Sequence, residues 1–242
     1  ALSVGGLALA SGKQWKVTAN GVIQQAVNAA NAGETVSVAS GTYSEHVSVS
    51  KAIALLGANA DVVGSSGARA AASTISSSGV ALTLASDGVT VKGFDLTAVT
   101  GVAVNGNKNI TVQNNFVTAS VVGIQLQNIA TASGQGVTIQ DNKVVLTGQF
   151  ASTTPTVAIG LTGISGNQAV ALQDNVVQGA FTGYLLYGVI TVPATTIKGG
   201  SITGVMQGVD AINVDPVSGT VYAPTLFAVD GVTMSAFEGD YP

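Results

Sequence analysis

The chain has 242 residues, of which 46% are hydrophobic and only 8% are charged, and its formal net charge is −4. A charged fraction so far below the roughly 25% of ordinary domains excludes a disordered chain. The acidic balance excludes an electrostatic grip on nucleic acid. With no cysteine there is neither a disulfide framework nor a thiolate metal site. No apolar run reaches the roughly 18 residues of a membrane span, so we expect no membrane insertion.

The first ten residues, Ala1–Ala10, are apolar and uncharged and lack the basic region of a signal peptide. We interpret them as an N-terminus packed on the first coil, and a strand that docks onto a neighbouring subunit is the alternative. Lys13 to Thr18 is expected to form the first short strand, with Trp15 covering the end of the following helix. We therefore divide the chain into an N-terminal extension with its first strand (1–20) and one long domain (21–242).

The next segment changes its period from that of a helix to that of strands. Apolar residues recur at helical spacing over about 21–31, and Asn31-Ala32-Gly33 ends this helix. Alternating apolar residues then predict three short strands, around Val36–Val38, Val47–Val49 and Ile53–Leu55. One helix followed by three short strands is typical of the capped first coil of a parallel β-helix.

The same segment carries a family resemblance. The helix contains Ile23-Gln24-x-Ala26, and Gly33 to Gly57 then spells G-x-T-V-x-V-x-x-G-T-Y-x-E-x-V-x-V-x-K-x-I-x-L-x-G. This pattern resembles the first coil of secreted right-handed β-helix proteins, a superfamily of pectate lyases, pectin methylesterases, alginate epimerases and bacterial surface proteins. The resemblance implies an all-β fold, a single-stranded right-handed parallel β-helix with a short N-terminal capping helix. It also implies a secreted or cell-surface location. It does not imply an activity, because these families share the cap and first coil.

From Asp61 to Ser78 the chain is rich in small residues and has no clear period, so we predict a surface loop. The chain's single arginine, Arg69, lies in this loop.

From residue 80 onward the chain repeats an eight-residue motif. The copies begin 21, 27, 33 and 25 residues apart, and they are Val89–Leu96, Ile110–Val117, Val137–Val144, Val170–Val177 and, more loosely, Thr195–Ile202. A fixed motif at irregular spacing indicates a solenoid with one coil per repeat and loops of varying length.

Each position of the motif has an expected role. Positions 1 and 3 point inward and position 2 points outward. Positions 5 and 6 are Gly, Asn or Asp, apart from Phe94 at position 6 of the first copy, and these residues tolerate a left-handed backbone at a tight bend. Asn115, Asn142 and Asn175 share position 6 and should stack into a hydrogen-bonded ladder. Asp141 and Asp174 share position 5, and we interpret them as solvated turn residues, with a calcium or catalytic pair as the alternative.

A second strand, often marked by glycine, returns after each motif, as at Gly101–Val104 and Gly123–Leu126. Gly148–Thr156 and Asp215–Pro224 are predicted insertions. These loops and the Tyr184/Tyr187 pair are the expected places for recognition. Tyr184 and Tyr187 are three residues apart, so in a strand they point to opposite faces and at most one of them is exposed.

The inventory of reactive side chains is short. The single histidine, His46, is expected on the surface, and no cluster of His and carboxylate residues predicts a metal site. The motifs of the resembling enzymes are missing: Gln173-Asp174-Asn175 stands where pectin methylesterases have Q-D-T, and Asp215-Pro216-Val217-Ser218 does not supply the D-P-H-E of alginate epimerases. We therefore predict no catalytic, cofactor-binding or metal-binding residue and lean against an enzyme.

The favoured function is a non-catalytic extracellular β-helix of a bacterial surface or secreted protein, acting as a structural, self-assembling or adhesive module. Its expected partners are a second copy, bound through Ala1–Ala10 and the C-terminal coil, and a polysaccharide. No amphipathic capping helix is evident after Leu226, and an uncapped solenoid end invites stacking. The alternative is a polysaccharide-processing lyase or hydrolase that uses Asp141 and Asp174. An ice-binding row of Thr90, Thr111 and Thr138 is a third interpretation, but the Thr-x-Thr regularity is absent.

Overall fold

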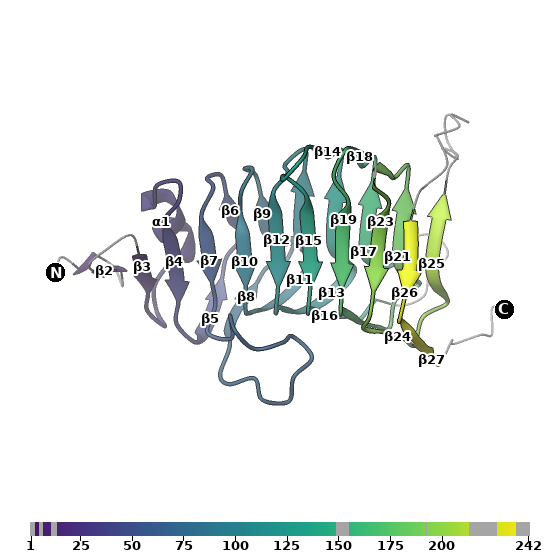
Figure 1. Ribbon diagram of the computed structural model, residues 1–242. Helices are drawn as coiled ribbons and strands as arrows, with labels where there is room; N and C mark the ends of the chain where they lie inside the picture. Colours follow the sequence, from purple (N-terminus) through teal and green to yellow (C-terminus); the bar gives the residue numbers. More distant parts are fainter. Residues whose placement is uncertain are drawn as a thin grey trace.

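The computed structural model describes residues 3–4, 7–10, 14–148, 155–191, 193–212 and 227–235. In this part of the chain, strands stack in sequence order into three sheets, which form a β-solenoid (Figure 1). Apart from the first two pairings, the strands of these sheets are parallel. One helix, α1 (Ile23–Ala29), lies at the N-terminal end and buries Ile23, Ala26 and Val27. The predicted parallel β-helix with a short N-terminal helix is confirmed.

The first sheet carries the start of each motif. Its strands, in spatial order, are β1 (Ser3–Val4), β2 (Leu7–Ala10), β3 (Gln14–Val17), β4 (Thr35–Val38), β7 (Ala54–Leu56), β10 (Thr90–Lys92), β12 (Ile110–Gln113), β15 (Val137–Gln140), β19 (Val170–Gln173), β23 (Thr195–Lys198) and β26 (Phe227–Asp230). All five motif copies are aligned residue for residue, as predicted.

The second sheet carries the end of each motif and the returning strand. Its strands, in chain order, are β5 (Gly41–Ser44), β6 (Val47–Val49), β8 (Ser73–Ser76), β9 (Val80–Leu84), β11 (Phe94–Asn105), β13 (Phe116–Gln127), β16 (Lys143–Leu146), β17 (Val157–Thr162), β20 (Val176–Gln178), β21 (Thr182–Tyr187), β24 (Ser201–Thr203), β25 (Gln207–Ile212) and β27 (Thr233–Ser235). The third sheet is small and contains β14 (Ala130–Thr131), β18 (Ser165–Gly166) and β22 (Ile190–Thr191).

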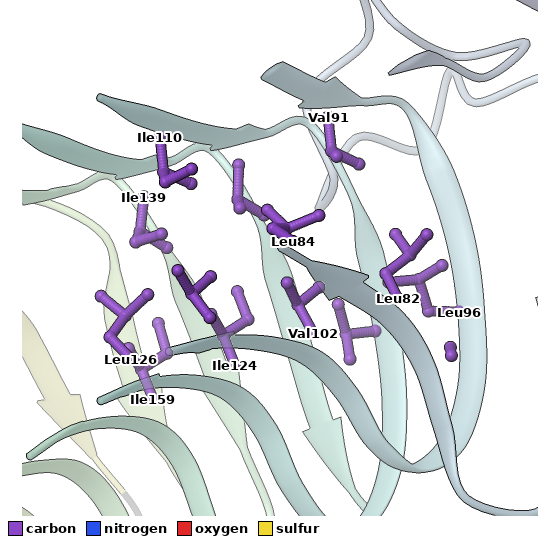
Figure 2. Packing of buried hydrophobic residues seen from close by; sticks show 14 of the residues in the cluster. Leu82, Leu84, Val91, Leu96, Val102, Ile110, Ile124, Leu126, Ile139 and Ile159 are labelled. Atoms are coloured by element: carbon purple, nitrogen blue, oxygen red, sulfur yellow. The ribbon is translucent and has the colours of Figure 1, made fainter. Parts of the chain in front are cut away.

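The core is a set of columns that run along the solenoid. Position 3 of the motif forms one column, in which each residue pairs with the next: Val36, Leu55, Val91, Val112, Ile139, Leu172 and Ile197, all 0–1% exposed. Side chains of the second sheet pack against these from the opposite side (Figure 2). The alternation of buried and half-buried residues in the strands confirms the predicted inward and outward positions.

The described backbone of Ala1–Ala10 pairs with its own chain. Strands β1 and β2 form an antiparallel hairpin, and β2 pairs antiparallel with β3. The hairpin therefore extends the first sheet, with β1 as its outermost strand. Most of the predicted insertion 148–156, all of 215–224 and the final residues 236–242 lie outside the described residues.

The predicted extent of the loop after the first coil is wrong. The loop expected from Asp61 to Ser78 ends earlier, because Ser73–Ser76 forms strand β8. This strand pairs with β5 on one side and β11 on the other, and Ile75 is fully buried in the core. Neighbouring coils impose the strand on a segment whose own sequence has few apolar residues.

Candidate functional site

Two charged residues of the first-coil pattern, Glu45 and Lys51, hold the helix in place. Both oxygens of Glu45 accept backbone N–H groups at the start of α1, from Ile23 at 2.8 Å and from Gln24 at 3.0 Å. At the other end, the ammonium group of Lys51 donates to the carbonyls of Asn28 and Ala30, each at 2.6 Å. Glu45 and Lys51 therefore satisfy the backbone groups that a helix leaves open at its ends.

Three further side chains anchor the same coil. The Gln24 amide bonds both backbone groups of Ser48, and the Tyr43 hydroxyl donates to the carbonyl of Ala39 at 2.8 Å. Burial, together with the nearby charge of Glu45, raises the pKa of the Tyr43 hydroxyl. The indole of Trp15 donates to Glu34 just beyond the helix, at 2.9 Å, and packs against the core. These contacts hold Trp15 beside the end of α1.

Arg69 binds the segment 57–72, which we call the strap, to the coils of the solenoid. Its guanidinium forms an ion pair with Asp95 and donates to the carbonyls of Asn114 at 2.8 Å and Phe94 at 3.2 Å. Only 11% of its side-chain surface is exposed. The chain's arginine therefore lies beneath a loop and does not project from an open face of the coils.

The strap lies along the bends between the first and second sheets. It leaves the solenoid after β7 (Figure 1), and the Gly64 N–H donates to the carbonyl of Asp141 at 2.8 Å. A Cβ at Gly64 would overlap the backbone of Asn115 and Lys143, so only glycine permits this approach. The buried Asn59 closes the neck of the strap: its Nδ2 donates to the carbonyl of Ala70 at 3.2 Å, and its Oδ1 accepts the N–H of Ala70 at 2.9 Å. The sequence prediction of an uncommitted surface loop missed this docking.

The asparagine ladder is confirmed. Asn115 donates through Nδ2 to Oδ1 of Asn142 at 3.0 Å, and Asn142 donates in the same way to Asn175 at 3.0 Å. Each Oδ1 also accepts a backbone N–H from the preceding coil, with Phe94 supplying the first. All three asparagines are buried, so their amides form a row of hydrogen bonds inside the solenoid and do not face a ligand.

The two aspartates lie where the motif predicts, at the bend of consecutive coils. Asp141 and Asp174 have φ angles of +55° and +51°, in the left-handed region. Asp174 is exposed and Asp141 half-buried, and Gln113 donates to Asp141 Oδ2 at 3.4 Å. Among the described residues, no group of three or more His, Asp or Glu side chains could hold a metal ion. The geometry supports the turn interpretation.

Tyr184 and Tyr187 lie on opposite faces of β21. Tyr184 points into the core and is 1% exposed, whereas Tyr187 is half-buried on the other face of β21. Burial strongly raises the pKa of the Tyr184 hydroxyl, and a hydrogen bond with Asn175 partly offsets this. The expectation of opposite faces is confirmed.

The outward face of the first sheet carries two parallel rows. Position 2 supplies Thr90, Thr111, Thr138, Ala171 and Thr196, and position 4 supplies Lys92, Gln113, Gln140, Gln173 and Lys198. Ala171 interrupts the threonine row, which weakens the ice-binding interpretation. The rows offer hydrogen-bonding groups on an open sheet.

The surface around the first coils has two hollows. A groove of about 720 Å³ lies between the ends of β3, β4 and β7 and the start of the strap, and its walls are largely apolar. A second hollow of about 500 Å³ lies on the second sheet and is lined by Ser44, Glu45, His46 and Ser76–Ser78. The imidazole Nε2 of His46 is 2.8 Å from the Thr83 hydroxyl, and the side chain is exposed, as predicted.

Similarity to known proteins gives no further guide to the site. Comparison with protein-family models, with curated proteins and with solved structures finds no match. Among the described residues, no helix is long and apolar enough to cross a membrane. The stacked parallel strands of the structure support the resemblance of the first coil at the level of the solenoid fold.

Proposed function

We propose that this chain is a non-catalytic, extracellular β-helical module that is structural and self-assembling. The observation that carries the proposal is the C-terminal coil, formed by β26 and β27. In the described part of the chain, no further strand stacks on either of them. Three large apolar side chains of this coil are exposed: Phe227 (37%), Val229 (42%) and Met234 (39%).

These side chains occupy core positions. Val229 pairs with Ile197 and Met234 with Ile202, and both partners are 0–1% exposed. Val229 therefore extends the position-3 column, and among the described strands only β23 pairs with β26. A strand edge beside an open apolar core favours the addition of another strand. The occupant that fits is a second copy of the chain, which would supply strand edges of its own, such as β1.

The non-catalytic part of the proposal is supported by how the reactive side chains are used. Glu45 and Lys51 bind the helix ends, and Arg69 binds Asp95 and carbonyl groups. The alternative of a polysaccharide-processing enzyme has less support, because among the described residues no third acidic or histidine side chain joins Asp141 and Asp174 in a cluster. The extracellular location rests on the resemblance of the first coil to secreted β-helix proteins.

The proposal is tested by the effect of a charge at the open end. We expect the wild-type protein to associate as its concentration rises, forming dimers or filaments, and Val229→Lys to weaken association about tenfold or more, because a charge would be buried in the contact. Sedimentation velocity and negative-stain electron microscopy measure this. Gln173→Lys is the matched control, because its row already contains Lys92 and Lys198; it should associate like the wild type.

A wild-type protein that stays monomeric at millimolar concentration would overturn the assembly proposal. Equal association of Val229→Lys and the wild type would place the contact elsewhere.

A further inference from the structure

The hollow on the second sheet has a cause in the lengths of the first two coils. Ser44 pairs with Ser76, and Val47 pairs with Leu82. Between these paired positions, the first coil has only Glu45 and His46, whereas the second coil has the longer segment 77–81. The longer corner projects past the shorter one, and the step between them forms the hollow of about 500 Å³.

Every residue that lines the hollow has a polar side chain. The polar groups are the hydroxyls of Ser44, Ser76, Ser77 and Ser78, the carboxylate of Glu45 and the imidazole of His46. Within the described chain, the hydroxyls of Ser44, Ser76 and Ser78 take part in no hydrogen bond. The Ser77 hydroxyl accepts only a 3.3 Å bond from the Gly79 N–H. Each hydroxyl can donate one hydrogen bond and accept two, so the hollow offers many unused donors and acceptors.

Two charged or titratable side chains are already held in position. Glu45 is fixed by its two bonds to the helix N–H groups, and each of its oxygens keeps a second lone pair. His46 is fixed through Nε2 by the Thr83 hydroxyl at 2.8 Å, which leaves Nδ1 free. Groups that are fixed before binding lose little conformational freedom when a ligand arrives.

We propose that this hollow binds a neutral saccharide. A ring with several hydroxyl groups both donates and accepts hydrogen bonds, which matches a lining of hydroxyls, a carboxylate and an imidazole. An acidic sugar is disfavoured, because the Glu45 carboxylate and the net charge of −4 repel it. The site lies beside the helix, away from the outward rows of the first sheet.

The surface next to the hollow extends this contact along the solenoid. Ser44 and Ser76 are followed in register by Thr97 and Thr118 on β11 and β13. These two hydroxyls also make no hydrogen bond within the described chain. Since neighbouring strands are about 4.8 Å apart, a linear oligosaccharide lying along the axis meets one hydroxyl on each coil. The row ends at Val145, which pairs with Thr118.

The test uses Val229→Lys as the background, so that association does not affect the readout. The protein is titrated with neutral hexasaccharides of glucose, xylose and mannose and with oligogalacturonate, and binding is followed by amide NMR shifts. We expect millimolar or tighter binding of at least one neutral probe, with shifts confined to 41–49 and 73–84 and to the neighbouring positions 94–98 and 116–119 of the hydroxyl row. Adding Ser76→Val and His46→Ala should weaken it about tenfold, since several hydrogen bonds are lost.

Thr196→Val on the first sheet is the matched control, because it removes one outward hydroxyl far from the hollow and should leave binding unchanged. Folding of each variant is checked by its thermal midpoint. Absence of shifts with every neutral probe, preference for oligogalacturonate, or equal binding by the Ser76→Val/His46→Ala protein would each overturn the proposal. None of these results bears on assembly, which is measured separately.

Discussion

Asn142 occupies the middle of the asparagine ladder and uses its whole side-chain amide. It donates to Asn175 and to the carbonyl of Val112, and its Oδ1 accepts from the side chain and the backbone N–H of Asn115. Removing it leaves the backbone N–H of Asn115 buried without that acceptor. An unpaired buried polar group is unfavourable, since no water replaces the lost bond.

We therefore expect Asn142→Ala to lower the free energy of unfolding by roughly 2–4 kcal/mol. Urea unfolding followed by circular dichroism measures the change. Gln140→Ala, two residues earlier on the outward face, is the control and should change the free energy by less than about 0.5 kcal/mol. Similar losses in the two variants would mean that the ladder contributes no more than an outward side chain.

At this scale the sequence reveals some roles and hides others. The ladder is predictable because the three asparagines share one position in aligned motifs. The roles of Glu45, Lys51 and Arg69 are not, because each contact joins residues far apart in the chain, 45 positions in the case of Arg69 and Asn114. No repeated pattern identifies such a partner.

Among the elements, β11 and β13 differ most from expectation. The end of the motif and the glycine-marked strand were predicted as separate strands, but each pair is one continuous strand of 12 residues. Gly101 and Gly123 lie inside these strands, at positions where a Cβ would overlap a neighbouring coil. Because glycine has no side chain, each strand can bend inward and still keep its backbone hydrogen bonds to the neighbouring coils.

Gly123→Ala should therefore destabilise the protein by about 3 kcal/mol, at the upper end of overpacking effects. The new methyl group would overlap the Ala158 carbonyl and the Val144 side chain, and a backbone carbonyl in a ladder cannot move aside easily. The free energy of unfolding in urea checks this. Gly160→Ala is the control, since its Cβ would meet only Val157 Cγ1, at 3.4 Å. A tolerated Gly123→Ala would show that the bend does not require glycine.

For the whole molecule, alkaline pH is expected to limit stability through Tyr184. Burial raises the pKa of its hydroxyl above the ordinary value of about 10. The folded state therefore holds this proton more tightly than the unfolded state does. The stability is fully present below about pH 10 and is lost as the pH rises through the higher folded pKa.

Thermal midpoints measured between pH 8 and pH 12 test this expectation. The midpoint of the wild-type protein should fall steeply above about pH 10, and that of Tyr184→Phe should fall less steeply. Some slope should remain, because the pKa of Tyr43 is also raised. Parallel curves for the two proteins would contradict the assignment to Tyr184.

The architecture of the whole molecule is the most predictable level. Each coil repeats the same inward columns, so the five motif copies indicate a solenoid even though their spacing varies. The hollow on the second sheet was not predictable, because it depends on the difference in length between the corners at Glu45–His46 and 77–81. That difference becomes visible only when the register of β5 with β8 and of β6 with β9 is known.

The strap also changes how the molecule should fold. In a plain solenoid each coil touches only its neighbours, so unfolding can start at an end and proceed one coil at a time. The strap leaves the solenoid after β7 and crosses the coils of β10 and β12. Its Gly64 N–H then reaches the carbonyl of Asp141, just after β15. Opening any of these coils therefore disturbs contacts of the others, through Arg69, Gly64 and Asn114. We therefore expect the strap to join them into one cooperative folding unit, at which fraying from either end stops.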